Sequence, residues 1–438
     1  MAEEDQVHLS CLPVTSVVSN WTYLYPYANT PPRDLCVASR GAGPHLPTRA
    51  MLLGCSDLIS VAHTFLLNQG SKTCGNDEPW SATPLQVICC DFEPCLITRS
   101  LLYLQLVLGE TTAADQDVPL DDIVMAWEVA HSMFITPEAV ERLQKAAEGI
   151  LGCFEDDAKW DREGLGRFGI HVTGDKAAVV DLLKWWCDGL EKGLFSGRVA
   201  VTSVQTARKR LREALGMTEV YDQTMLIHKV NGGDPRLEEF IDSYLAQGFT
   251  GVDGILACSG GGLSPTESVK RKCVNPTFLA DVYDFPKKIA KLPKGVAASD
   301  VGKVWRVHYF ANPYQSCPLD LIKCFEELSK PSTKFVTGAR SGCLSPAQWC
   351  FELFGQRTEA MAAALATGRH QIVLHCGDAF ALCDALRPQD PRATLPCKIP
   401  EVKKLRAFLR GLRFPNQFDF IDTSNIGDNT GVLPILLA

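Results

Sequence analysis

The sequence predicts a Rossmann-like α/β fold, in which a mostly parallel sheet is interrupted by a large, mostly helical insertion. Three observations lead to this prediction. Four short apolar runs each end in a polar cluster, which is typical of buried strands in a parallel sheet. A helical pattern separates the first two runs, as a crossover between parallel strands requires. Amphipathic helical patterns then dominate the long stretch between the second and third runs.

The first half of the sheet begins with the apolar run Met51–Leu53, which Gly54 closes and a helical pattern follows. The second run, Leu85–Cys90, is continuously apolar and stops at Asp91. The apolar helix expected over residues 95–108 is preceded by a proline, which suits the first turn of a helix. Strand, helix, strand and helix in this order predict the start of a doubly wound sheet.

The second half of the sheet begins after a long interruption. Gln371–Cys376 and Phe418–Ile421 restore the strand pattern, with helices expected at 379–386 and 401–410. Before them, the sequence Thr136-Pro137 predicts a capped helix start. Further helices are predicted at 175–190, 201–215, 235–246, 318–328 and 345–366. The predicted parts are an irregular segment 1–50, a first sheet part 51–109, the insertion 110–367 and a second sheet part 368–438, which is expected to end before the sheet is complete.

Composition excludes several classes of function. The apolar fraction is 46% and the charged fraction 21%, as in ordinary globular proteins. Lys and Arg number 43 and Asp and Glu 51, so the net charge of −8 argues against binding to nucleic acid or to an anionic membrane. The sequence lacks a signal-peptide pattern and an apolar run of membrane-spanning length. A cytoplasmic protein is expected.

The 18 cysteines are expected to be free thiols, because disulfide frameworks belong to small secreted domains. Structural zinc sites bring ligands in close Cys-x-x-Cys pairs, and the sequence contains none. We therefore predict no metal site.

The candidate binding residues follow the predicted strands, because the carboxyl ends of parallel strands line the ligand site of such sheets. Gly54 supplies the glycine that a nucleotide-binding turn needs, although Ser56 and Leu58 replace the later glycines of the full fingerprint. Asp91 is placed to accept hydrogen bonds from a ribose. An equally open alternative is that Asp91 only stabilises the start of the next helix.

The later strand ends carry similar residues with similar alternatives. Gly377 and Asp378 either contact an adenine amino group or turn the chain and cap a helix. Asp422 to Asn425 either hold part of a cofactor or acceptor, or merely close the strand. The segment 169–176 has the look of a phosphate loop with one extra residue, and we interpret this as chance. The serine-hydrolase motif Gly-x-Ser-x-Gly is absent.

Several stretches together carry a resemblance: Leu52-Leu-Gly-Cys-Ser-Asp57, Cys90-Asp-Phe-Glu-Pro94, Val274-Asn-Pro-Thr277, Val307-His-Tyr309, Phe418-Asp-Phe-Ile-Asp-Thr-Ser-Asn425 and Gly431-Val-Leu433. The sequence resembles the N-terminal domain shared by dynein axonemal assembly factor 3 and many MYND-type zinc-finger proteins of unknown function. The resemblance implies a methyltransferase-type fold and adds Asp57 to the candidate cofactor contacts. It does not imply activity. Ser56 stands where relatives usually have glycine, which weakens the inference that a cofactor binds. The MYND zinc cluster is missing from this sequence.

Three hypotheses of function follow. The first is a non-catalytic scaffold or assembly factor, for which the resemblance implies protein partners such as chaperones or dynein subunits. The second is an S-adenosylmethionine-dependent methyltransferase that holds its cofactor with Gly54, Asp91, Asp378 and Asp422. The third is a small-molecule binding module of another class.

Overall fold

The computed structural model describes residues 32–37, 47–55, 57–69, 84–109, 118–197, 201–202, 204–205, 248, 273–278, 346–387, 400–414 and 417–423. Its elements, in chain order, are β1 (Thr48–Leu53), α1 (Ile59–Gln69), β2 (Leu85–Asp91), α2 (Pro94–Leu108), α3 (Leu120–His131), β3 (Phe134–Ile135), α4 (Pro137–Phe154), α5 (Asp157–Glu163), η4 (Leu165–Phe168), β4 (Ile170–Gly174), α6 (Lys176–Glu191), β5 (Cys273–Val274), η6 (Pro276–Phe278), α14 (Pro346–Ala366), β6 (Gln371–Cys376), α15 (Ala379–Leu386), α16 (Pro400–Gly411) and β7 (Phe420–Asp422).

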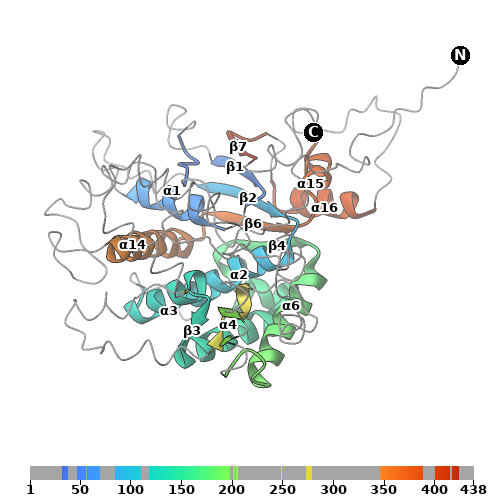
Figure 1. Ribbon diagram of the computed structural model, residues 1–438. Coiled ribbons are helices and arrows are strands. Elements are labelled where there is room, and N and C mark those ends of the chain that lie inside the picture. The colour runs from blue at the N-terminus through green and yellow to red at the C-terminus, as the bar shows by residue number, and fades with distance from the viewer. Residues whose placement is uncertain are drawn as a thin grey trace, which may run out of the picture.

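The centre of the molecule is a five-stranded sheet with the order β4-β6-β2-β1-β7, and all four strand pairs are parallel (Figure 1). The predicted α/β class and mostly parallel sheet are therefore confirmed. The four predicted strands are β1, β2, β6 and β7. β1 begins at Thr48 rather than Met51, since Thr48 already pairs with Leu85 and is buried.

The fifth strand, β4, lies within the region that the sequence assigns to a helical insertion. It pairs with β6, so the segment that has the look of a phosphate loop is an edge strand of the sheet. Its two bounding glycines have positive φ angles, 74° at Gly169 and 84° at Gly174. A Cβ atom at these positions would lie 2.2 Å from the carbonyl oxygen of His370 and 2.0 Å from that of Cys376. The glycines are required by this close approach to β6.

Helices cover both faces of the sheet (Figure 1). On one face, α1, α2 and α14 cover strand residues such as Leu52 and Cys89. On the other face, α15 and α16 cover Met51, Ile88 and Val373. The alternation of these residues along each strand directs successive side chains into two separate cores.

A further layer of helices, α3, α4 and α6, packs against the outer side of α2. The predicted capped helix is confirmed, because the Thr136 hydroxyl accepts a hydrogen bond from the Ala139 N–H at 3.2 Å and Pro137 begins α4. The helix predicted at 175–190 is α6, which Asp175 caps. The helices predicted at 201–215, 235–246 and 318–328 lie mostly or wholly outside the described residues.

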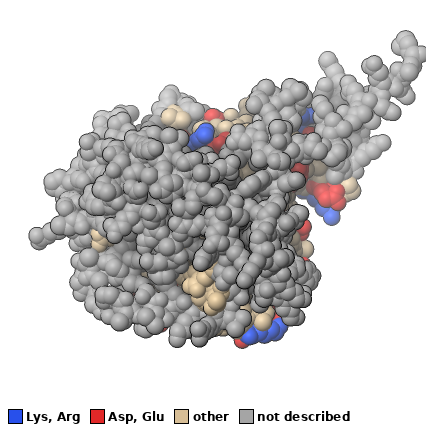
Figure 2. Space-filling model, in the orientation of Figure 1, with Lys and Arg blue, Asp and Glu red and all other residues tan. Residues whose placement is uncertain are grey.

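Charges on the surface are mixed in sign. On the face shown in Figure 2, the described Lys and Arg side chains lie close to described Asp and Glu side chains, in small groups. Elsewhere on the surface, Lys192 and Asp188 of α6 form an exposed ion pair at 2.8 Å. Within the parts of the chain that the structure describes, no helix combines the length and the apolar composition needed to cross a membrane.

Candidate functional site

The strand order reverses at β1, because β2 and β6 lie on one side of β1 and β7 lies on the other. In open α/β sheets, ligands bind beyond the carboxyl ends of the strands at such a reversal. Gly54 directly follows β1, and Asp422 is the last residue of β7 and the register partner of Leu52. The structure therefore brings these two predicted residues to neighbouring strand ends.

Gly54 and Asp57 shape the turn between β1 and α1. Gly54 has a φ of 72°, and the N–H groups of Gly54 and Cys55 both donate to the carbonyl oxygen of Cys90, at 2.8 and 3.0 Å. The left-handed conformation explains the glycine. The Asp57 carboxylate accepts a hydrogen bond from the Ile59 N–H at 3.0 Å, which stabilises the start of α1.

Asp91 lies at the end of β2, where the sequence predicts it, but the residue is only 6% exposed. It accepts a hydrogen bond from the Glu93 N–H at 3.0 Å, at the entrance to α2. Burial raises the pKa of Asp91 to about 7, against the opposing effect of this hydrogen bond. A ribose could reach this carboxyl group only if the residues that cover it moved.

Gly377 and Asp378 connect β6 to α15. The Gly377 N–H donates to the carbonyl oxygen of Asp91 at 2.9 Å and so extends the sheet by one bond. The exposed Asp378 carboxylate accepts from the Ala381 N–H at 2.8 Å and is the N-cap of α15. Of the two alternatives for Asp378, the structure shows the helix cap.

Asp422 forms an ion pair with Arg33, whose Nε lies 3.3 Å from the carboxylate. The segment 32–37, to which Arg33 belongs, runs along α1. The Arg33 N–H donates to the Ser60 hydroxyl at 3.2 Å and the Leu35 N–H donates to the Thr64 hydroxyl at 3.0 Å. This segment therefore places a cation beside the sheet reversal. Asn425, the remaining predicted site residue, lies outside the described residues.

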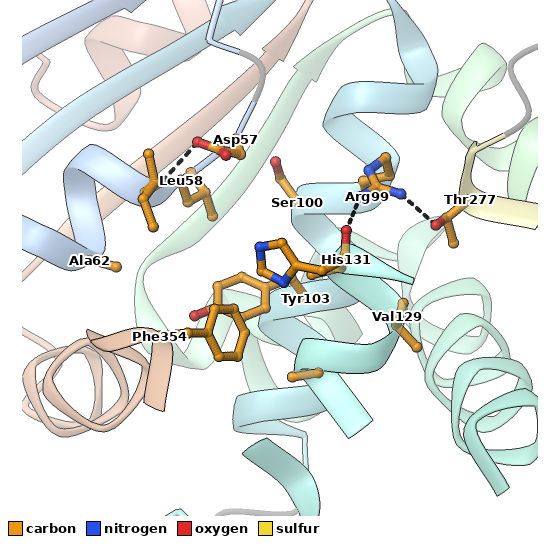
Figure 3. A pocket seen from close by; sticks show the side chains of 13 residues that line it. Asp57, Leu58, Ala62, Arg99, Ser100, Tyr103, Val129, His131, Thr277 and Phe354 are labelled. Carbon is orange, nitrogen blue, oxygen red and sulfur yellow. Dashed lines mark hydrogen bonds between the residues drawn. The ribbon is translucent and has the colours of Figure 1, made fainter. Parts of the chain in front are cut away.

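A cavity that the sequence did not predict lies between α1, α2, α3 and α14 (Figure 3). Its volume is about 60 Å³. This is room for about five water molecules. Its lining residues are Asp57, Leu58, Ile59, Ala62, Arg99, Ser100, Tyr103, Ala126, Val129, Ala130, His131, Thr277 and Phe354.

One side of the cavity is formed by a buried polar network. Arg99 donates to the carbonyl oxygen of Ala130 at 2.7 Å and to the Thr277 hydroxyl at 2.5 Å, and its guanidinium group lies over the ring of Phe278. The side-chain oxygen Oδ1 of Asn275 accepts hydrogen bonds from the N–H and the hydroxyl of Thr277. The Thr277 hydroxyl therefore donates to Asn275 and accepts from Arg99, which fixes the position of the guanidinium group.

Aromatic rings line another side. His131 and Phe354 pack edge to face with ring centres 5.2 Å apart, and Tyr103 lies 5.7 Å from Phe354. Burial, together with the nearby charge of Arg99, lowers the pKa of His131 to about 3, so the imidazole is neutral at physiological pH. The Tyr103 hydroxyl hydrogen-bonds to Thr358 at 2.8 Å, and burial raises the pKa of Tyr103.

Sequence reasoning missed Arg99, Asn275, Thr277 and His131 as members of one site. One signal was present: Arg99 is the only charged residue in the apolar helix α2. A second signal was the stretch 274–277, which carries part of the resemblance. Its local sequence alone does not indicate a function. In the part of the chain that the structure describes, no group of three or more His, Cys, Asp or Glu side chains could hold a metal ion, and the cysteines are free thiols.

Replacing Asn275 by alanine is expected to destabilise the protein by about 2 kcal/mol, because buried groups would lose their hydrogen bonds. The Asn275 amide donates to the carbonyl oxygens of Val129 and Ser132, both at 2.8 Å, and its own side chain is fully buried. Urea denaturation would measure the change. Gln144→Ala is the control, since that amide makes only an exposed bond on α4 and should cost less than about 0.5 kcal/mol. Equal losses in the two variants would contradict the network.

The described residues form an α/β protein with a five-stranded parallel sheet and a separate cavity beneath α2. The carboxylates at the strand ends already have partners within the protein. Residues 26–135 match the family model described as a domain of unknown function, DUF4470. The matched segment is about a quarter of the chain, and all cavity-lining residues except Thr277 and Phe354 lie in it. No curated protein and no solved structure shows a significant match to the chain.

Proposed function

We propose that this protein is a non-catalytic scaffold or assembly factor built on a degenerate methyltransferase-like fold. The observation that carries the proposal is the internal use of the strand-end carboxylates. Asp91 bonds to Glu93, Asp378 caps α15 and Asp422 pairs with Arg33. A cofactor would have to displace these contacts before it could use the same groups, which reduces its binding free energy.

The resemblance stated above supports a role in the cytosolic assembly of protein complexes, with chaperones or dynein subunits as partners. One exposed aromatic residue is consistent with a protein interface beyond the carboxyl end of β2, the central strand. Phe92, between Asp91 and Glu93, is 69% exposed. Exposed aromatic side chains are common anchors of protein interfaces.

The second candidate is an S-adenosylmethionine-dependent methyltransferase. It is favoured by the order β6-β2-β1-β7, in which β6 lies beside β2, the strand that Asp91 ends, and β7 lies on the opposite side of β1. This order creates the reversal at which nucleotides bind in doubly wound sheets. Gly54, Asp91, Asp378 and Asp422 would then surround the cofactor.

Calorimetric titration with S-adenosylmethionine distinguishes the two candidates. The scaffold proposal predicts no saturable heat at micromolar to millimolar concentrations, because the carboxylates are already engaged. Micromolar binding that is lost in Asp91→Ala would contradict it and support the methyltransferase. Asp188→Ala is the control, because Asp188 lies on the exposed surface of α6 and pairs only with its neighbour Lys192 among the ion pairs of the described residues. Circular dichroism of each variant verifies that it folds.

A further inference from the structure

A second pocket lies between α4, α6 and β5, and it shares no described lining residue with the cavity beneath α2. Its volume is about 210 Å³. An apolar cavity of about 150 Å³ is large enough to bind benzene, so this pocket has room for a molecule with one ring. Figure 1 shows α4 and α6 together, below the five-stranded sheet. The described residues that line the pocket are Pro137, Val140, Leu190, Phe195, Ser196 and Cys273.

Backbone pairing holds one wall of the pocket in place. β5 pairs with β3, with Ile135 opposite Cys273, and Cys273 also forms an antiparallel bridge with Ser196. The Val274 N–H donates to the carbonyl oxygen of Phe195 at 2.8 Å. This wall is therefore formed before a ligand arrives, and little ordering is needed on binding.

The ring of Phe195 is fixed by its neighbours. Phe195 is buried, and its ring packs edge to face on Trp185 with ring centres 5.5 Å apart. A Cβ atom at Gly189 would lie 2.3 Å from the Phe195 ring, so glycine at this position makes room for the ring. The Leu194 N–H donates to the carbonyl oxygen of Gly189 at 2.8 Å and closes the turn that carries Phe195. Phe195 therefore presents a preformed aromatic surface to the pocket.

The chemistry of the lining favours an uncharged ligand. Four of the six described lining residues are apolar, and none of the six carries a charge at physiological pH. Burial raises the pKa of the Cys273 thiol to about 12, so this thiol stays neutral. A charged ligand would lose its hydration in the pocket without gaining a partner of opposite sign among these six residues.

Ser196 supplies a polar group at the outer end of the pocket. Ser196 is exposed, whereas Phe195 and Cys273 are buried. The Ser196 hydroxyl donates to the carbonyl oxygen of Gly193 at 3.1 Å, so its oxygen can still accept a hydrogen bond. An apolar pocket with one such polar group suits a ligand that has a ring and a single hydrogen-bond donor.

We propose that this pocket binds a small uncharged molecule of the phenol class, with its ring against Val140, Leu190 and Phe195 and its hydroxyl donating to Ser196. The proposal goes beyond the scaffold function. It uses none of the strand-end residues, so its failure would leave the scaffold proposal unaffected.

Three fluorinated probes of similar shape test the proposal on the unmodified protein by fluorine NMR: 4-fluorophenol, 4-fluorobenzoate and 4-fluorobenzylamine. At neutral pH they are uncharged, negative and positive, respectively. We expect 4-fluorophenol to bind at one site with a Kd of about 1 mM or tighter. The two charged probes should bind at least about tenfold more weakly, because their hydration is not replaced. The proposal is overturned if 4-fluorophenol does not bind, or if either charged probe binds equally well.

A larger side chain in the pocket locates the bound probe. Val140→Trp places two rings in the empty space and should abolish binding of 4-fluorophenol. The matched control is Glu141→Trp, at an exposed position of the same helix, which should bind the probe as the unmodified protein does. Circular dichroism verifies that each variant folds. Unchanged binding in a folded Val140→Trp variant would place the probe elsewhere and overturn the assignment.

Removal of the Ser196 hydroxyl tests the orientation of the ligand at an exposed position, where folding is not at risk. Ser196→Ala should weaken binding of 4-fluorophenol about fivefold, because one hydrogen bond is lost. Binding of 4-fluorotoluene, which has the same shape but no donor, should not change. Equal binding of 4-fluorophenol by Ser196→Ala and the unmodified protein, or an equal loss for both probes, would overturn the proposed contact.

Discussion

Replacing Gly174 by alanine is expected to destabilise the protein by about 4 kcal/mol. A φ of 84° costs a non-glycine residue about 1–2 kcal/mol. The added Cβ would also lie 2.0 Å from the carbonyl oxygen of Cys376, and relieving an overpacked contact costs about 1–3 kcal/mol more. The atom that must move belongs to the backbone of β6, which is paired on both sides. Urea and thermal denaturation would measure the loss.

Gly368→Ala is the matched control for this substitution. Gly368 also has a positive φ, 65°, but an added Cβ would meet nothing within 4 Å. It should therefore lose only about 1 kcal/mol, the conformational part of the effect. Equal losses of stability in the two variants would contradict the close approach of β4 to β6. They would also contradict the assignment of β4 as the fifth strand of the sheet.

Acidification from pH 7 to pH 5 is expected to reduce the free energy of unfolding by roughly 5 kcal/mol, after the opposing contribution of Asp91. Burial lowers the pKa of five described histidines: to about 3 for His63 and His131, to about 4 for His370 and His375, and in the same direction for His171. Below pH 6.5 the unfolded chain binds protons at these residues that the folded protein does not, so stability falls as the pH falls. Each histidine contributes about 1.4 kcal/mol per pH unit in this range.

Hydrogen bonding in the core gives an independent reason for the neutral histidines. The Nδ1 of His370 accepts a hydrogen bond from the Leu85 N–H at 3.0 Å, so it cannot carry a proton. Protonation would leave that backbone donor of β2 without its acceptor. The Nδ1 of His375 is buried and makes no hydrogen bond in the described structure. A charged imidazole at either position would be poorly solvated.

Asp91 opposes the loss of stability that the histidines cause on acidification, and its replacement is the control for that prediction. Its pKa is raised to about 7, so the folded protein holds a proton there that the unfolded chain releases above about pH 4. This carboxyl group therefore stabilises the fold as the pH falls from 7 to 5, by about 2 kcal/mol. Asp91→Asn should remove that contribution and make the acid loss steeper, while His375→Gln should make it shallower. Urea midpoints measured from pH 5 to 8 test both signs, and a flat profile in the unmodified protein would contradict them.

The strands that consist of continuous apolar residues could be predicted from the sequence, and the less apolar strand could not. β1, β2 and β6 are continuous buried runs, and the sequence alone locates each of them to within a few residues. β4 could not be recognised, because it has five residues, includes a histidine and a threonine, and is bounded by glycines that indicate a loop. Its place at the edge depends on contacts with β6, nearly 200 residues later in the chain.

The candidate site shows the same limit. The positions of Gly54, Asp91 and Asp378 at strand ends were predictable, but their hydrogen-bond partners were not, because a helix cap and a ligand contact require the same residue types. The cavity was not predictable at all. It combines segments from residue 57 to residue 354, and the bond between Arg99 and Thr277 spans 178 residues. No local pattern reports such a contact.

The arrangement of the sheet has a consequence for how the chain is made. β2 is complete early in synthesis, yet it pairs with β6, and the bond between Gln86 and Gln371 joins residues 285 positions apart. At translation rates of 5–20 residues per second, β2 waits roughly 15 to 60 s for this neighbour. During that interval β2 has no neighbouring strand on the side that β6 later occupies. The nascent chain is therefore expected to depend on holding chaperones until the ribosome has passed β6, and a delay at this stage favours aggregation over folding.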